Sequence, residues 1–241
     1  MNWQPGIAER GEKKVIRVTE NFLKIKKLLE NSATDAGRDE DSVRLLAVSK
    51  QKPLEAILEA ASAGQRDFGE NFVRDGVEKI KSADRDDLHW HFIGHIQSNK
   101  TRLIAEYFEW AHTIDREKIA RRLSEQRPQH APDLNVCIEV NIDAELQKSG
   151  VLPSETADLA RNISALPRLK LRGLMCLPKI RDGFEEQRKP FAALRELQAS
   201  LNSQGFSLDT LSMGMTADYA AAIHEGATIV RIGTALFGER E

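Results

Sequence analysis

The sequence predicts an α/β fold, a single (β/α)8 TIM barrel preceded by an extra N-terminal helix. The first observation is a repeating rhythm in which short, continuous apolar runs alternate with segments of helical periodicity. Such runs are typical of strands that are covered on both faces of a parallel sheet. The second observation is that eight strand–helix units fill the 241 residues with short turns. Barrels reach this length as one domain, and an open doubly wound sheet is the alternative.

The beginning of the chain differs from the repeating units. Residues 1–14 are polar, and we expect them to form a flexible extension. From Val15 to Ala36, apolar residues recur at helical spacing and Gly37 follows as a stop signal, which predicts the extra helix. No linker divides the remainder, so we expect residues 15–241 to form the barrel domain.

The eight expected strands are the apolar runs at 43–50, 66–70, 88–96, 110–114, 135–142, 169–177, 210–213 and 228–232. Helices are expected at 53–63, 71–82, 100–108, 115–126, 154–166, 184–203 and 217–226, with a last helical turn from Gly233. Pro53 is a preferred residue of a first helical turn, and Asp115 is expected to cap its helix.

Charge and composition narrow the classes of function. The formal net charge is −2 and no long basic block occurs, so nucleic-acid binding is not expected. The first residues lack an apolar signal core and no segment approaches membrane-spanning length, which predicts a cytoplasmic protein without a membrane partner. Cys137 and Cys176 lie in apolar runs and are expected to be reduced core residues.

Lys50 is the first candidate functional residue, because it follows the apolar run 45–48 at the carboxyl end of the first strand. Barrels place their chemistry at this end of their strands. A lysine with an apolar stem in low-dielectric surroundings can lose its proton and act as an amine nucleophile. Taken alone, this stretch more often indicates a lysine that extends into solvent.

Two glycine-containing turns form a candidate phosphate site. They are LSMGMT at 211–216 and RIGTALFG at 231–238, the loops after strands seven and eight, where barrels commonly bind phosphate. Small residues let backbone N–H groups approach an anion, and the hydroxyls of Ser212 and Thr234 can add donors. The alternative is that Gly214 and Gly233 serve only as turn residues.

Arg231 is the second candidate, because a guanidinium within the apolar run of strand eight is seldom buried without a partner. It either pairs with Glu70 or Glu139 or points at a ligand in the barrel mouth. Lys148, in the loop after strand five, either reaches that ligand or remains solvated.

Three histidines on the third strand suggest a different chemistry. His89, His91 and His95 have the same parity and are expected to share a face. A His-X-His pattern can bind zinc, so a metal-dependent hydrolase using His89 and His91 is one alternative function. Further ligands are not evident, because His112 and His130 are poorly placed for them.

The motifs together resemble the pyridoxal phosphate homeostasis protein family. They occur in that family's order and span roughly residues 40–238. The motifs are AVSKQKP, DFGENFV, WHFIGHIQSNK, NIDAELQKSGV, LRGLMCLP, LSMGMT and VRIGTALFG. The departures are mild, since Cys176 stands where many members have alanine and Thr216 replaces a frequent serine.

The resemblance implies the fold of the N-terminal barrel domain of alanine racemase and a site for pyridoxal 5′-phosphate (PLP). The implied cofactor-binding residues are Lys50 as the Schiff-base lysine, Asn71 in the barrel mouth, Ser212, Gly233 and Thr234 at the phosphate, and Arg231 facing the pyridine nitrogen.

The resemblance and the chemistry favour a carrier over an enzyme. A cationic Arg231 beside the pyridine nitrogen disfavours protonation of that nitrogen and weakens the ring as an electron sink. We therefore expect a protein that holds PLP as a releasable Schiff base in intracellular vitamin B6 homeostasis, without robust catalysis. The alternatives are a PLP-dependent amino-acid racemase and the metal-dependent hydrolase. Apo PLP-dependent enzymes are the expected recipients, and a monomer is expected.

Overall fold

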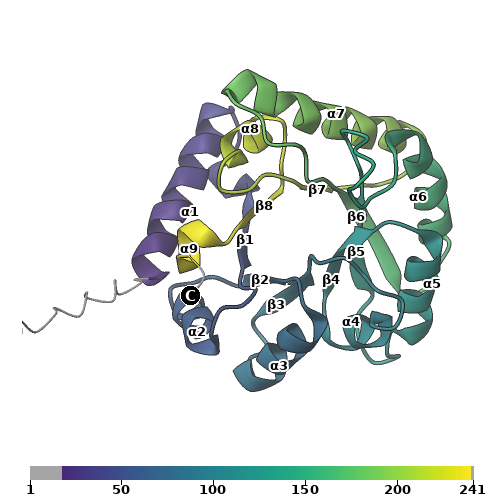
Figure 1. Cartoon of the computed structure of the whole chain (residues 1–241), viewed down its shortest axis with the longest axis horizontal. Helices are drawn as coiled ribbons and strands as arrows, with labels where there is room; N and C mark the ends of the chain where they lie inside the picture. The colour runs from purple at the N-terminus through teal and green to yellow at the C-terminus, as the bar shows by residue number, and fades with distance from the viewer. Residues whose placement is uncertain (1–17, 240–241) are drawn as a thin grey trace, which may run out of the picture.

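A computed structural model describes residues 18–239 of the chain. The predicted extension at 1–14, and the predicted start of the first helix at Val15, lie outside the described residues. Eight parallel strands pair in sequence order and close into a barrel, which confirms the predicted fold (Figure 1). The strands are β1 (Arg44–Val48), β2 (Asp67–Glu70), β3 (His89–Phe92), β4 (Trp110–Ile114), β5 (Leu134–Glu139), β6 (Leu169–Met175), β7 (Thr210–Ser212) and β8 (Ile229–Ile232).

Helices surround the barrel on its outside (Figure 1). They are α1 (Val18–Asp35), α2 (Leu54–Ser62), α3 (Val73–Ala83), α4 (Thr101–Tyr107), α5 (Glu117–Gln126), α6 (Thr156–Ser164), α7 (Phe184–Ser203), α8 (Tyr219–His224) and α9 (Thr234–Phe237), with 3-10 turns η1 (Glu40–Ser42) and η2 (Pro153–Glu155). Within the described part of the chain, no helix combines the length and apolar character needed to span a membrane.

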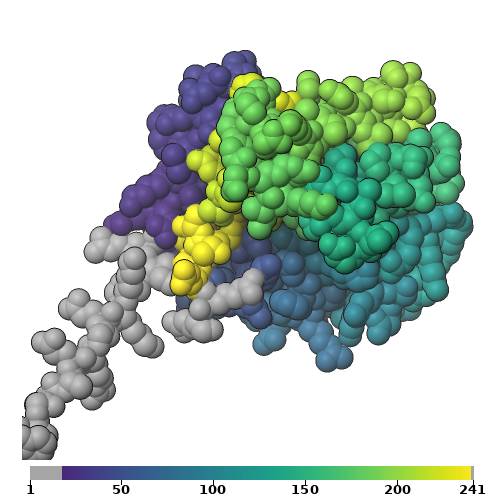
Figure 2. Space-filling model, turned by 45° about the horizontal axis from the view of Figure 1, so that its top comes forward, coloured from purple at the N-terminus to yellow at the C-terminus, as the bar shows by residue number. Residues whose placement is uncertain are grey.

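The extra helix α1 packs beside the end of the chain. Its apolar stripe, which includes Phe22, Ile25 and Leu29, is buried. The Nδ2 atom of Asn21 donates to the Leu236 carbonyl oxygen of α9 at 3.0 Å. Figure 2 shows the yellow C-terminal segment against the purple helix α1. The first described helix, α1, therefore contacts the last, α9, beside the pairing of β8 with β1 that closes the barrel.

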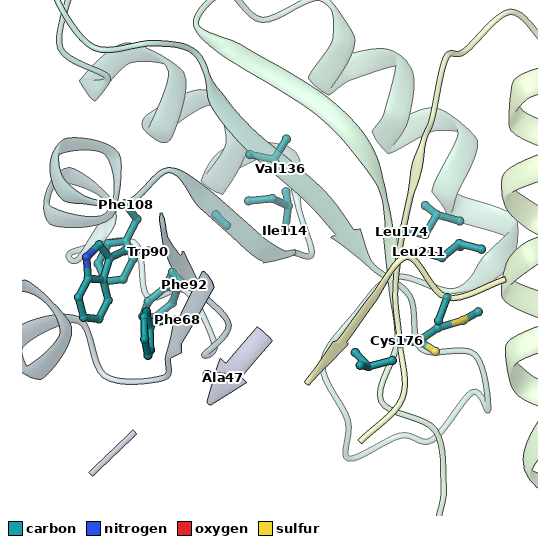
Figure 3. Packing of buried hydrophobic residues seen from close by; sticks show 14 of the residues in the cluster. Ala47, Phe68, Trp90, Phe92, Phe108, Ile114, Val136, Leu174, Cys176 and Leu211 are labelled. Carbon is teal, nitrogen blue, oxygen red and sulfur yellow. The ribbon is translucent and has the colours of Figure 1, made fainter. Parts of the chain in front are cut away.

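The main apolar core lies between the strands and the surrounding helices. Phe68 and Trp90 on β2 and β3 have ring centroids 5.6 Å apart, and Phe92 packs edge-on to Phe108 at 5.5 Å. Figure 3 shows these four rings gathered on one side of the strands. All four side chains are at most 3% exposed, so their burial contributes several kcal/mol in total, at roughly 1.5–3 kcal/mol for each side chain.

The barrel interior has a different composition from this core. A small separate cluster there joins Trp110, Cys137 and Met175 of β4, β5 and β6. The Trp110 ring stacks on His91 with centroids 5.3 Å apart, and the guanidinium of Arg172 lies 5.0 Å from the Trp110 centroid. Barrel interiors are usually filled by branched apolar residues. This interior instead contains a continuous set of polar side chains.

Several strands end earlier than the apolar runs predicted. β3 ends at Phe92 instead of Ile96, and β5 ends at Glu139 instead of Ile142. Ile96 is buried although it lies outside the sheet, so the loop packs back on the core and prolongs the apolar pattern. Early strand ends leave room for the loops that carry the candidate site.

Most predicted helix starts lie one or two residues before the observed ones, and those of α2 and α5 bear on the residues expected to begin or cap them. α2 begins at Leu54, and Pro53 precedes it with an extended backbone at ψ 155°. α5 begins at Glu117 with Arg116 at its N-cap position, so Asp115 does not cap it. The Asp115 carboxylate instead accepts hydrogen bonds from the Arg116 guanidinium, at 2.8 and 3.0 Å.

Candidate functional site

Lys50 follows β1 at the carboxyl end of the barrel, above a buried polar cluster. The hydroxyl of Ser49 donates to Glu70 Oε1 at 2.7 Å, and Lys79 Nζ donates to the same oxygen at 2.9 Å. Lys79 Nζ also donates to the Ser49 carbonyl oxygen at 2.9 Å. These contacts tie β1, β2 and α3 together directly beside Lys50. The sequence analysis did not single out Lys79, because α3 contributes this lysine from a distant position in the chain.

The backbone after Lys50 is equally constrained. Gln51 has a φ of +58°, a left-handed conformation that non-glycine residues adopt only when their surroundings impose it. Lys52 Nζ then donates to the carbonyl oxygens of Gly238 and Glu239, at 3.0 and 2.7 Å. The half-buried Lys50 is therefore held between the buried cluster and the end of the chain.

Arg231 is buried on β8 and is held by oxygen atoms of β7 and the β6 loop. Its Nη1 donates to the carbonyl oxygen of Ser212 at 2.6 Å and to the Ser212 hydroxyl at 2.9 Å. Its Nη2 donates to the Cys176 carbonyl oxygen at 2.9 Å. These bonds use three of its five N–H donors and leave the others for a ligand.

The ion pair that the sequence left open for Arg231 does not form. Glu70 instead binds Ser49 and Lys79. Glu139 acts on Arg231 only as a nearby charge. Burial, with the charge of Asp115, raises the pKa of Glu139 to about 7, while Arg231 opposes this shift. The mouth therefore holds a fixed cation beside a carboxyl group that titrates near neutrality.

The loops after β7 and β8 meet at the same edge of the barrel as Lys50. Gly214 has a φ of +91°, and its carbonyl oxygen accepts the Arg231 backbone N–H at 3.0 Å. A Cβ atom on Gly233 would lie 3.2 Å from the carbonyl oxygen of Val48 at the end of β1. The structure thus places the turn at Gly233 against the end of β1, two residues before Lys50.

The hydroxyl groups near these two loops differ in their exposure to solvent. Ser212 is fully buried, and its hydroxyl contacts His112 and Arg231 inside the barrel. The phosphate role that the resemblance implies for Ser212 stays a prediction. Thr216 and Thr234 are exposed, one in each loop, and Thr216 is a phosphate-binding candidate that the sequence motifs did not single out.

A cavity of about 330 Å³ opens in the barrel mouth among the loops that follow β2 to β6. Asn71 lines it, together with His95, Glu139, Asn141 and Lys148. The other sequence-predicted site residues do not line this cavity and lie on or directly after β1, β7 and β8. Lys148 is not simply solvated, because its Nζ pairs with Glu145 at 2.6 Å and donates to the Leu177 carbonyl oxygen at 3.1 Å.

The histidines behind the alternative of a metal-dependent hydrolase do not gather at one place. His89 pairs with Glu109 at 2.8 Å where β3 begins, and His95 is exposed in the loop after β3. His112, which the sequence analysis considered poorly placed as a further metal ligand, lies next to His91, with its Nε2 2.9 Å from His91 Nδ1. Within residues 18–239, however, no group of three or more His, Cys, Asp or Glu side chains is arranged to hold a metal ion. The two histidines bind each other instead.

The cysteines are core residues, as predicted. Cys137 and Cys176 are both buried free thiols. Burial raises the pKa of each thiol to about 12, which keeps both protonated at neutral pH. The contribution of Cys176 to the site is its backbone carbonyl oxygen, which holds Arg231.

Comparison with known proteins first defines the class of this barrel. The family model described as "Alanine racemase, N-terminal domain" matches residues 23–241 of the chain. The fold of alanine racemase from Corynebacterium glutamicum agrees at a TM-score of 0.68 and 16% identity, over 92% of this chain and 61% of that chain. At this identity the likeness shows the fold alone.

Within this class, the chain belongs to the pyridoxal phosphate homeostasis protein family, as its motifs indicated. The protein of that name from Vibrio cholerae is 54% identical over 228 residues, which cover 93% of this chain and 97% of the relative. The Escherichia coli K12 protein is 47% identical with the same coverage. PipY of Synechococcus elongatus, solved with PLP bound, matches at a TM-score of 0.80 and 35% identity, over 92% of this chain and 100% of that chain.

Proposed function

We propose that this protein binds pyridoxal 5′-phosphate reversibly and acts in intracellular vitamin B6 homeostasis as a carrier, without robust catalysis. The observation that carries the proposal is the placement of Lys50. Lys50 follows the carboxyl end of β1, which pairs with β8 through Ala47 and Ile232, and the turn at Gly233 lies against the last residue of β1. Its relatives' names and the bound ligand of PipY support the same cofactor.

The donor set of the mouth fits the parts of this cofactor. The Lys50 amine supplies a reversible covalent bond to the aldehyde group. The remaining N–H donors of Arg231 suit the pyridine nitrogen. Backbone N–H groups near Gly233, with the hydroxyls of Thr216 and Thr234, suit the phosphate, and Asn71 lines the mouth on the other side. Ser212 acts here by holding Arg231.

Arg231 limits the chemistry that the bound cofactor can perform. When bound, PLP supplies an electron-withdrawing ring that can stabilise carbanions. A guanidinium beside the ring nitrogen keeps this nitrogen unprotonated, because two adjacent positive charges repel each other. Storage and release are thereby favoured over racemisation. We also propose that the protein is a cytoplasmic monomer, and that apo PLP-dependent enzymes receive the cofactor.

Borohydride trapping tests the assignment of Lys50. The wild-type protein, loaded with PLP and reduced, should carry its pyridoxyl label on the peptide that contains Lys50. Lys50→Ala should lose this label and its visible absorbance while the far-UV circular dichroism is unchanged. Lys148→Ala is the matched control at the same mouth and should keep the label. A label found mainly on another lysine of the wild-type protein would contradict the assignment.

Chiral analysis separates the carrier from a racemase. Incubation of the loaded protein with single L-amino acids should leave their enantiomeric purity unchanged. Formation of D-enantiomers that depends on Lys50 would instead establish the racemase alternative.

A further inference from the structure

A continuous hydrogen-bonded chain crosses the barrel interior beneath the candidate site. His91 Nε2 lies 3.0 Å from Asp67 Oδ1, and His91 Nδ1 lies 2.9 Å from His112 Nε2. His112 Nδ1 lies 2.8 Å from the Ser212 hydroxyl, which accepts from Arg231 Nη1 at 2.9 Å. The chain therefore links the start of β2 to the guanidinium proposed to face the cofactor.

The direction of every hydrogen bond in this chain follows from its two ends. An ionised Asp67 only accepts, so His91 carries its proton on Nε2 and accepts at Nδ1. His112 must then donate from Nε2, which leaves its Nδ1 as an acceptor. The Ser212 hydroxyl donates to that nitrogen and accepts from the charged Arg231. With both histidines neutral, each of these atoms has a partner of the right kind.

Burial and charge favour this single arrangement. His91, His112 and Ser212 are fully buried, and Asp67 and Arg231 are 9% and 5% exposed. Burial lowers the pKa of His91, against the pull of Asp67, and lowers that of His112 further with the charges of His91 and Arg231. Burial alone would raise the pKa of Asp67, but His91 and Arg44 bring it below its ordinary value.

We propose that His112, supported by His91 and Asp67, is a positioning residue of the cofactor site. Its Nδ1 accepts the hydrogen bond that the Ser212 hydroxyl donates. A lone pair of the Ser212 oxygen is then left to accept the hydrogen bond from Arg231. The guanidinium is then held in one orientation, with its remaining donors toward the mouth. The effect on the cofactor rests on the proposed function. The hydrogen-bonded series from Asp67 to Arg231 does not, because it is present in the protein without any cofactor.

A purely packing role explains these residues less well. Apolar side chains would fill the interior without the cost of burying two imidazoles and a carboxylate. A half-satisfied polar network is worse than an apolar interior, so each member of the chain depends on the next. The series of hydrogen bonds ends at the buried guanidinium of Arg231, so its members can orient a residue of the candidate site.

Histidine NMR tests the direction of the chain without any cofactor. Two-bond ¹H–¹⁵N spectra of the cofactor-free, ¹⁵N-histidine-labelled protein distinguish the two neutral tautomers from the imidazolium. His91 and His112 should both be neutral and protonated on Nε2 at pH 7, with signals assigned through the variants His91→Gln and His112→Asn. A His112 ring that is charged or protonated on Nδ1 would overturn the proposal, because Ser212 would then receive a proton instead of donating one.

Cofactor release tests the positioning role. His112→Leu removes the acceptor for Ser212, and we expect release about ten-fold faster with a shifted absorbance band, since one net buried hydrogen bond is worth about a factor of ten. His112→Asn keeps an oxygen near the former Nδ1 position and should restore release to within about three-fold of wild type. His89→Ala, an exposed histidine on the same strand, is the matched control and should change neither quantity.

The outcomes separate this proposal from the proposed function. A wild-type protein that takes up no PLP would contradict both. Uptake by the wild type with the same release rate and spectrum in folded His112→Leu would overturn the positioning role alone. If His112→Leu does not fold, two other results decide the question. The proposal is upheld when His112→Asn releases the cofactor as fast as wild type and both histidines show the predicted tautomers. Tautomers of the opposite direction refute it.

Discussion

At the scale of single residues, Glu139 shows how the mouth combines burial with charge. Its carboxyl is 7% exposed, lies at the end of β5 and lines the cavity. Burial and Asp115 raise its pKa from an ordinary 4.5 to about 7, against the opposing charge of Arg231. A carboxyl whose pKa is higher in the folded state binds more protons there than in the unfolded chain. Its ionisation therefore destabilises the fold as the pH rises from about 4.5 to 7.

Glu139→Gln should stabilise the protein at pH 8, because the neutral amide avoids this ionisation. The gain is at most about 3 kcal/mol above pH 7 and should vanish near pH 4.5, where the native carboxyl is also protonated. Urea denaturation of both proteins between pH 4.5 and 8 measures the difference. A gain that does not vary with pH would show that Glu139 does not titrate in this range.

At the scale of elements, the turn between β7 and α8 depends on Gly214. Its φ of +91° is unfavourable for a residue with a side chain, and a Cβ atom there would lie 2.6 Å from the Cβ of Ala222. The same turn supplies the carbonyl oxygen that binds the Arg231 backbone. Backbone conformation, helix packing and the site are therefore coupled at one position.

Gly214→Ala should destabilise the protein by about 2–4 kcal/mol, from the left-handed backbone and the overlap with α8 together. Gly37→Ala is the matched control, because Gly37 has a φ of +71° with nothing within 4 Å of the added Cβ. The control should lose only about 1–2 kcal/mol, the cost of the backbone conformation. Thermal and chemical unfolding measure both losses, and equal losses would mean that α8 moves aside freely.

At the scale of the whole molecule, the polar interior makes the barrel sensitive to acid. His91 and His112 both have folded-state pKa values below the ordinary 6.5, chiefly because both are fully buried. The unfolded chain binds protons on these histidines first as the pH falls. Their contribution to stability is therefore present above pH 6.5 and is lost below it, until the folded values are reached.

The free energy of unfolding should fall by up to about 2.7 kcal/mol per pH unit below pH 6.5 from these two histidines, about 1.4 for each. The ionisation of Glu139 changes the free energy of unfolding in the opposite direction over the same pH range. The measurement is therefore made in the Glu139→Gln variant, which lacks this carboxyl. Adding His112→Leu in this background should halve the slope. Denaturation at pH 7.5, 6.0 and 5.0 checks the expectation, and a slope unchanged by His112→Leu would contradict it.

Local patterns in the sequence determined the fold class and indicated where along the chain the candidate site lies. Continuous apolar runs identify buried parallel strands, and chemistry in such folds lies where those strands end. These patterns alone therefore place Lys50, Gly233 and Thr234 at one edge of the barrel. The family motifs added the cofactor, because they combine many positions that no single spacing explains.

Only the tertiary structure decided the contacts of the interior. Parity placed His89, His91 and His95 on one face, but β3 ends at Phe92 and the three histidines separate. The partners of His91 are Asp67 and His112, from neighbouring strands of the closed barrel. Ser212 lies 100 residues from His112 in the chain. Barrel closure sets these distances, and the local pattern of a sequence contains no record of which distant side chains closure brings together.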